Sequence, residues 1–255
     1  GIEEEHAVAM SSGLAKNGAK PVFCVYSTFM QRTYDQLSQD LCLNNNPALI
    51  LVYGASIYEE SDATHLGIFD IPMISNIPNL VYLAPTNKEE YFKMLDWGLN
   101  QTEHPVAIRV PVVDVVSIGE EDKTDYSILN KYKVTKKGKD VAIIALSNFY
   151  NLGKEIADEL GDVTLINPVY ITGLDEELLE KLKENHKLVI TLEDSVLDGG
   201  FGEKVSRFYG TSDVKVKNYG IKKSFPDRFD VEEFLIENGI SKEQIIKDIK
   251  ELLAK

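Results

Sequence analysis

The stretch PVFCVYSTFMQRTYDQLSQDLCLNNNPALILVY at residues 21–53 decides the fold. Its two ends, residues 21–26 and 48–53, are short apolar runs rich in β-branched residues, which is typical of buried strands. Between them four apolar side chains recur at helical spacing: Met30, Tyr34, Leu37 and Leu41. They predict a helix that turns one stripe toward the core. Continuously apolar strands alternating with helices indicate a parallel sheet covered on both faces.

The same alternation continues along the rest of the chain. Apolar runs follow at residues 80–84 and 105–110, and Thr86 with Glu89 forms a capping-box signature that predicts the start of another helix. The composition then turns polar and charged before four more strand-like runs, at residues 141–146, 163–166, 187–192 and 214–219. We therefore expect an α/β protein with two consecutive units and mostly parallel sheets flanked by helices. The predicted boundaries are 1–118 for the first unit, 119–138 for a linker and 139–255 for the second unit.

Composition excludes several classes of partner. The net charge of −14 argues against binding to nucleic acid or to an anionic membrane surface, because both need a basic footprint. No apolar run approaches the length of a membrane span. The two cysteines, Cys24 and Cys42, form no disulfide or metal-binding pattern, so we expect two buried thiols and a cytoplasmic protein. The chain begins without methionine, which suggests a fragment of a longer protein.

Residues 54–79 form a long connection without strong periodicity. Such connections in α/β units lie at the carboxyl ends of the strands, where ligands bind. His65, in the middle of this connection, is a candidate for catalysis, although a lone loop histidine is more often a surface residue or a structural hydrogen-bonding group.

Five stretches together resemble, in order and spacing, the pyrimidine-binding domain of the transketolase-like enzymes that depend on thiamine diphosphate. They are GIEEEHAVAMSSGLA, PVFCVYSTFMQRTYDQ, THLGIFD, IPNLVYLAPTNKEE and VAIRVP. Within that family, YSTFMQRTYDQ is most similar to the 1-deoxy-D-xylulose-5-phosphate synthase branch. ITLEDSVLDGGFGEKV at residues 190–205 resembles the family's C-terminal domain.

The resemblance implies a catalytic role for Glu4. In the family, a glutamate two residues before the histidine of this motif is protonated and donates to N1′ of the cofactor's aminopyrimidine, which promotes the imino tautomer. The alternative is that Glu3, Glu4 and Glu5 only favour the positive end of a helix, and we prefer that reading for Glu3 and Glu5.

The resemblance assigns five further residues. Phe29 would stack on the aminopyrimidine, and Tyr26 and Arg32 would stand at the substrate side of the cofactor. His65 would assist proton transfer at donor and acceptor oxygens. Arg109 would bind the phosphate of the acceptor, because a guanidinium suits phosphate oxygens. The plainer alternatives are a core residue for Phe29, a strand-end residue for Tyr26 and a solvated helix residue for Arg32.

Three departures from the family pattern concern the acceptor. Tyr53 and Gly54 stand where the family has an aspartate–arginine pair after the second strand. Ser61 replaces the aspartate four residues before the histidine, with Asp62 one place away, and Val112 replaces the arginine of the family's Y-P-R-G. These changes make an acceptor other than a phosphorylated aldehyde a second hypothesis.

The family's diphosphate-binding signature, G-D-G followed by an asparagine, is absent from the sequence. We therefore expect Mg²⁺ and the diphosphate to be held by an N-terminal domain of a parent chain or of a separate subunit, with no metal ligands in this chain and no activity without that domain. The implied reaction joins pyruvate, with decarboxylation, to glyceraldehyde 3-phosphate, in the synthesis of isoprenoid and thiamine precursors. The alternatives are a transketolase-like or acyloin-forming carboligase with an unphosphorylated acceptor, and a non-catalytic dimerisation module. The resemblance also implies a homodimer.

Overall fold

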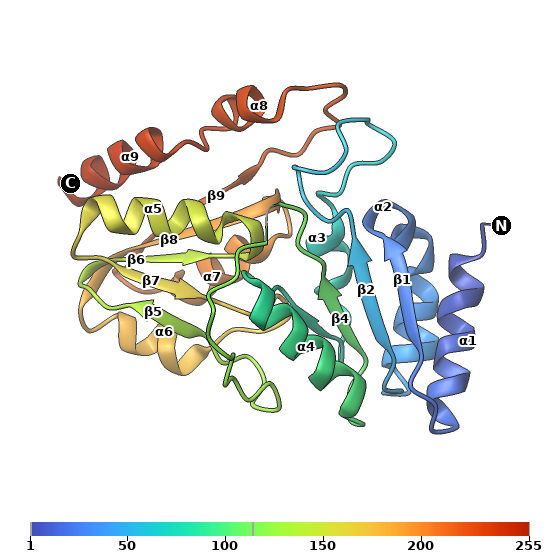
Figure 1. Ribbon diagram of the computed structural model, residues 1–255. Coiled ribbons are helices and arrows are strands. Elements are labelled where there is room, and N and C mark those ends of the chain that lie inside the picture. The colour runs from blue at the N-terminus through green and yellow to red at the C-terminus, as the bar shows by residue number, and fades with distance from the viewer. Residues whose placement is uncertain (1, 114, 255) are drawn as a thin grey trace.

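The structure is a computed structural model that describes residues 2–113 and 115–254 (Figure 1). Its strands form two sheets, one in each half of the chain. The first sheet has the order β1-β2-β4-β3 and the second has the order β5-β7-β6-β8-β9. The strand pairs within both sheets are parallel except β5 with β7. The predicted α/β class, with two units and mostly parallel sheets, is confirmed.

The first unit contains four strands and the helices that flank them. These are α1 (Glu4–Lys16), β1 (Val22–Tyr26), α2 (Ser27–Met30), the short 3-10 helix η1 (Gln31–Thr33), the π-helix η2 (Gln36–Cys42), β2 (Leu49–Tyr53), α3 (Asp70–Ile74), β3 (Val81–Leu83), α4 (Lys88–Asn100) and β4 (Val106–Arg109).

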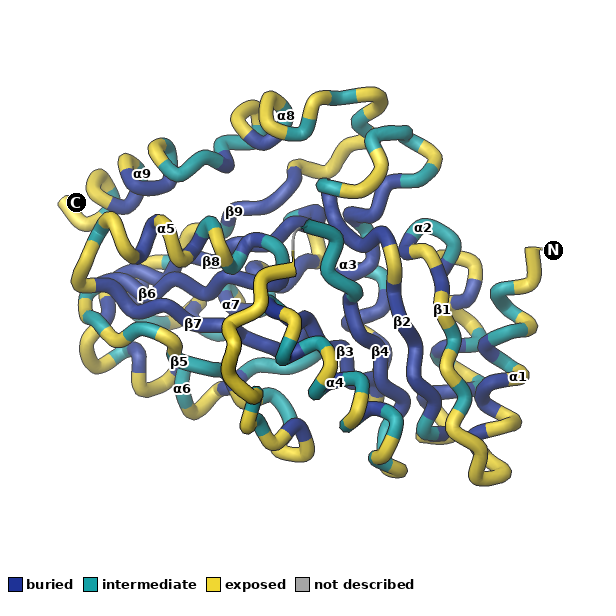
Figure 2. Tube along the Cα trace, in the orientation of Figure 1, coloured by how far each residue is buried: buried dark blue, intermediate teal, exposed yellow. Residues whose placement is uncertain are grey.

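Alternate side chains of β2 face two different layers, as the period of a strand requires. Ile50 and Val52 pack with the core side chains of α1, α2 and η2, whereas Leu49 and Leu51 pack with Met94 of α4. Helix α4 approaches closely because it has glycine at position 98, where a Cβ would lie 2.9 Å from Leu49 Cδ1. Strand β4 and the first four residues of β2 are therefore buried, and these central strands are mostly dark in Figure 2.

Strand β1 lies at the edge of this sheet and is covered on one face only. Its residues Val22, Cys24 and Tyr26 are exposed, although their register partners Leu49 and Leu51 are buried. The difference arises because α4 covers β2 but, among the described residues, no helix packs over the same face of β1. The prediction that Cys24 is buried was wrong, while Cys42 is buried as predicted.

The second unit follows the same plan. Its elements are β5 (Lys133–Lys136), β6 (Asp140–Ala145), η3 (Ser147–Phe149), α5 (Tyr150–Leu160), β7 (Thr164–Asn167), α6 (Glu176–Leu182), β8 (His186–Val196), α7 (Phe201–Tyr209), β9 (Lys215–Ile221), α8 (Val231–Glu237) and α9 (Lys242–Ala254). Ala142 and Ile144 of β6 face the layer that contains α7, and Val141 and Ile143 face α5 and α9. The sheet is thus covered on both faces.

Main-chain hydrogen bonds join the two units. The N–H of Ala84, after β3, donates to the carbonyl of Val169 at 2.7 Å, and the N–H of Ile171 donates to the carbonyl of Tyr82 at 2.8 Å. A bridge pairs Leu83 with Tyr170. The segment after β7 therefore runs beside β3, and the two sheets meet there.

Three local predictions differ from the structure. The helix expected at residues 29–41 is divided into α2, η1 and η2, so Tyr34 leaves the buried stripe and donates from its hydroxyl to Asn76 instead. Helix α4 begins one residue later than predicted, because Asn87 caps it by accepting from the N–H of Glu90. The segment predicted as a linker, 119–138, contains β5, which forms the edge of the second sheet. The predicted boundaries of the two units, 1–118 and 139–255, stay predictions.

Candidate active site

Glu4 is the first residue of α1 and is only partly buried, its side chain being 18% exposed. Arg32 Nη1, from η1, lies 3.3 Å from Glu4 Oε2. Glu4 also lines a hollow of about 310 Å³ together with Cys24, Tyr26 and Phe29. A carboxylate and an aromatic ring therefore border the same open space, which is large enough for a single heteroaromatic ring.

Phe29 lies at the centre of the predicted residues. Its ring is 6.3 Å from that of Tyr26 and 5.5 Å, edge-on, from that of His65, measured between centroids. Arg32 Cζ lies 5.8 Å from the same ring. Five of the six predicted residues, Glu4, Tyr26, Phe29, Arg32 and His65, are thus brought together from α1, from the end of β1 with the helices that follow it, and from the connection after β2.

His65 is oriented by two neighbours that the sequence analysis did not select. Thr64 donates from both its N–H and its hydroxyl to Asp62 Oδ1, and the Thr64 hydroxyl oxygen lies 2.8 Å from His65 Nδ1. The Thr64 hydroxyl has one proton, which is directed to Asp62, so its oxygen accepts from the N–H at His65 Nδ1. In this tautomer Nε2 of His65 carries the lone pair, and within residues 2–113 and 115–254 it makes no hydrogen bond. The hydrogen bonds from Thr64, with a smaller contribution from His65, lower the pKa of Asp62.

The pattern D-x-T could have identified this pair, because aspartate commonly accepts from the backbone two residues further along in turns.

Tyr26 lies against the connection that carries His65. Glu59 raises the pKa of Tyr26, with smaller contributions from burial and from Glu60. Gly54 has φ +62°, and a Cβ there would lie 2.6 Å from Tyr26 Cε1. The ring of Tyr26 therefore occupies the space that a side chain at position 54 would need, and this is the position where the sequence departs from the family's arginine.

Arg109 lies apart from the other five residues and is completely buried. It donates through Nε and Nη2 to both oxygens of Asp70, at 2.9 and 3.3 Å, and through Nη1 to Asp194 of the second unit. Tyr82 donates to Asp70, and Ser56 donates to Asp194. Burial lowers the pKa of Arg109, but the two carboxylates outweigh it and hold the pKa above its usual value. No part of the guanidinium faces solvent, so its placement conflicts with the prediction that it binds a phosphate.

Comparison with known proteins identifies the family. Residues 1–115 match the model of the transketolase pyrimidine-binding domain, and residues 130–245 match that of the transketolase C-terminal domain. The chain belongs to the transketolase family. Its curated relatives include two proteins named 1-deoxy-D-xylulose-5-phosphate synthase. That of Clostridium tetani is 36% identical over 99% of this chain, and that of Carboxydothermus hydrogenoformans is 37% identical over 100% of it.

The chain spans 41% and 42% of the lengths of these two relatives. A solved structure described as "Split gene transketolase, inactive beta4 tetramer" matches with a TM-score of 0.84 and 20% identity, over 98% of this chain and 82% of that one. This likeness shows that the two chains share the transketolase fold.

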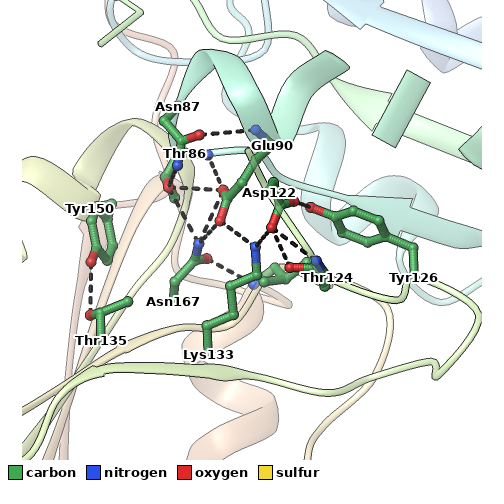
Figure 3. Close-up of polar contacts among 11 residues, drawn as sticks. Thr86, Asn87, Glu90, Asp122, Thr124, Tyr126, Lys133, Thr135, Tyr150 and Asn167 are labelled. Atoms are coloured by element: carbon green, nitrogen blue, oxygen red, sulfur yellow. Dashed lines mark hydrogen bonds and ion pairs between the residues drawn. The ribbon is translucent and has the colours of Figure 1, made fainter. Parts of the chain in front are cut away.

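A larger hollow, of about 660 Å³, lies elsewhere in this transketolase-family chain and contains none of the predicted residues. A polar cluster on its wall joins the two units (Figure 3). Glu90 of α4 accepts from Thr86, from Asn167 and from Lys133 of β5, and Lys133 also contacts Asp122 at 3.0 Å. These side chains are paired with one another, which is the arrangement of an interface rather than of a binding site.

In residues 2–113 and 115–254, no three or more His, Cys, Asp or Glu side chains form a group that could hold a metal ion. None of the helices in the same ranges combines the length and the apolar character needed to cross a bilayer.

Proposed function

We propose that this chain is the pyrimidine-binding and C-terminal portion of a 1-deoxy-D-xylulose-5-phosphate synthase-like enzyme that uses thiamine diphosphate. Its reaction would transfer a two-carbon unit from pyruvate, with loss of carbon dioxide, to an aldehyde, with glyceraldehyde 3-phosphate as the default acceptor. One observation carries the proposal. Glu4 and Phe29 border the same hollow, and Tyr26, Arg32 and His65 surround Phe29.

The residues around this hollow suit an aminopyrimidine. Glu4 would hold a proton at the ring nitrogen N1′, and Phe29 would stack on the ring face. Arg32 Nη1 now donates to Glu4 Oε2, so Glu4 must exchange this partner for the ring nitrogen. Thiamine diphosphate, when bound, supplies the carbon nucleophile that adds to the substrate carbonyl. His65, with Nε2 free to accept, would take a proton from a substrate oxygen.

The remainder of the site would come from another polypeptide region that holds the diphosphate through Mg²⁺. Two findings support this part of the proposal. The chain spans about two fifths of its curated relatives, and the solved neighbour is described as a split-gene transketolase and as an inactive tetramer. We propose that the missing domain is fused in a parent chain or supplied by a separate subunit, that the active form is a homodimer in the cytoplasm, and that this chain alone is inactive.

A second candidate acceptor, an unphosphorylated aldehyde, is favoured by the charge around the hollow. Arg109 is committed to Asp70 and Asp194, and the connection beside Tyr26 carries Glu59 and Glu60. Arg32, which lies beside Phe29, pairs with Glu4. A dianionic acceptor gains little attraction in such surroundings.

The test is a turnover assay on the complete enzyme, containing this chain, the diphosphate-binding region, thiamine diphosphate, Mg²⁺ and pyruvate. Glyceraldehyde 3-phosphate is compared with glyceraldehyde. A strong preference for the phosphorylated aldehyde supports the synthase reaction, and pyruvate consumption without that preference supports the other carboligase. If no pyruvate is consumed with either acceptor, the proposed reaction is wrong, and a dimerisation module or transketolase donor chemistry replaces it.

A further inference from the structure

The connection that carries His65, residues 54–69, belongs to the first unit in sequence but packs into the second. Its apolar side chains Ile57, Leu66 and Ile68 are buried at 3% exposure or less, in the same core as Val141 and Ile143 of β6. Near His65 it also contacts its own unit: Thr28 donates to the carbonyl of Thr64, and the Phe29 ring lies beside that of His65.

Hydrogen bonds from the second unit hold both ends of this connection. Ser56, near its start, donates to Asp194 at 2.6 Å. The carbonyl of Ile68, near its end, accepts from the hydroxyl of Ser195 at 2.8 Å and from the N–H of Val196 at 2.9 Å. These three contacts are buried, so they also contribute to the stability of the whole interface.

The tip of the connection is held by an exposed segment of the second unit, residues 225–228. Asp227 Oδ1 accepts from the N–H of Ala63 at 3.1 Å, and the N–H of Arg228 donates to the carbonyl of Ser61. Arg228 has φ +50°, a conformation that costs free energy for a non-glycine residue and persists only where surrounding contacts fix it. The Phe225 ring lies 5.6 Å from that of Phe69. Figure 1 shows this segment, between β9 and α8, beside the connection that follows β2.

We propose that the second unit positions His65, with Asp227 as the residue that fixes the tip of the connection. The role of His65 in this statement rests on the proposed function. Asp227 accepts a hydrogen bond from the N–H of Ala63, which lies two residues before His65. Ala63 stands between Asp62 and Thr64, the two residues whose hydrogen bonds orient His65 Nδ1. Loss of this contact releases the N–H of Ala63, whereas the main-chain hydrogen bond from Arg228 to Ser61 and the buried contacts at the two ends of the connection remain.

Three variants separate positioning from stability. Asp227→Ala removes the acceptor, Asp227→Asn retains an oxygen at the same place, and Asp213→Ala is a matched control because Asp213 is an exposed aspartate of the same unit. Hydrogen exchange of residues 61–65 and the ring resonances of His65 are measured in the 255-residue chain. With four histidines in the chain, His65→Gln identifies the His65 signals.

We expect Asp227→Ala to raise exchange at residues 61–65 at least tenfold and to shift the His65 resonances, with the melting temperature unchanged. Asp227→Asn and Asp213→Ala should match the wild type. Unchanged exchange in Asp227→Ala would overturn the proposal, as would equal changes in Asp213→Ala. These measurements do not require turnover, so they are independent of whether the proposed reaction is right.

The complete enzyme provides the second readout. Asp227→Ala should lower kcat several-fold with the KM for pyruvate unchanged, and Asp227→Asn should restore most of the loss. If the wild type turns over and Asp227→Ala has the same kcat, His65 is not positioned through Asp227 for the reaction. If the wild type consumes no pyruvate, the proposed function fails and the exchange result still decides what holds the connection.

Discussion

Two carboxylate–arginine pairs in this chain have similar chemistry but differ in their exposure to solvent. Glu4 and Arg32 face each other across 3.3 Å with side chains 18% and 34% exposed, whereas Asp194 and Arg109 are wholly buried. Arg109 also binds Asp70, which in turn accepts from Tyr82. The open pair can exchange one partner for a ligand, because water and ligand reach it. The buried pair is committed to joining the two units, because removing either partner leaves an uncompensated charge.

The largest expected effect tests this contrast on stability. Arg109→Met should lower the free energy of unfolding by about 3–5 kcal/mol, because it leaves Asp70 and Asp194 buried without their cation. Arg32→Met should change it by less than about 1 kcal/mol, since exposed pairs contribute little. Urea unfolding of both variants measures the difference. Similar values for the two would mean that the buried ion pairs of Arg109 stabilise the fold no more than the exposed pair does.

The second effect tests the open pair on activity. Glu4→Gln should reduce turnover of the complete enzyme at least about 100-fold, because an amide cannot supply the carboxyl proton. Glu5→Gln, in the same turn of α1, is the matched control and should remain near wild type. Steady-state rates at saturating cofactor make the comparison. Near-normal turnover in Glu4→Gln would remove Glu4 from the proposed site.

The third effect concerns a carboxyl group inside the second unit. Burial raises the pKa of Glu193 to about 8, even though the N–H groups of Phe201 and Gly202 donate to it. The folded pKa lies above the ordinary value of 4.5, so between these two values the folded state keeps a proton that the unfolded state releases. Stability from this group is complete below the lower value and falls as the pH rises toward the upper one.

The slope expected from Glu193 is at most about 1.4 kcal/mol per pH unit. Denaturant unfolding from pH 5 to pH 8 measures it, and Glu193→Gln should flatten the profile. A wild-type profile that rises with pH in this window, and that the substitution does not change, would contradict the assignment.

The smallest effect tests the orientation of His65. Thr64→Val removes the hydroxyl that joins Asp62 to His65 Nδ1 and should lower kcat about two- to tenfold. Because Thr64 is exposed, the free energy of unfolding should change by less than about 0.5 kcal/mol. Thr102→Val, at another exposed threonine, serves as the control. Equal rates in both variants would show that His65 needs no such support.

The sequence predicted what depends on local pattern. The strands at residues 21–26 and 48–53 were found because β1 and β2 are apolar throughout. The prediction that Tyr34 faces the core was wrong, although its helical spacing is real. The helix is divided into α2, η1 and η2, which leaves Tyr34 exposed. Nothing in the local sequence pattern indicates that division.

The candidate site was predicted through the resemblance, and its five members Glu4, Tyr26, Phe29, Arg32 and His65 do lie together. Arg109 shows where such reasoning ends. Its carboxylate partners stand 39 and 85 residues away in the sequence, so only the folded chain reveals that the guanidinium is fully used. The prediction that Cys24 is buried was wrong for a similar reason, because the exposure of Cys24 depends on how far α4 extends over the sheet.

The burial of Ile57, Leu66 and Ile68 among the side chains of the second sheet has a consequence for recombination between relatives. A crossover placed between the units would exchange the C-terminal half but leave behind the three residues that fit its core. A functional chimera therefore has to inherit the connection at residues 54–69 from the same parent as its second unit. The residues that must come from one parent are therefore the connection 54–69 together with the second unit. They are separated in the sequence, although the strands of each sheet follow one another along the chain.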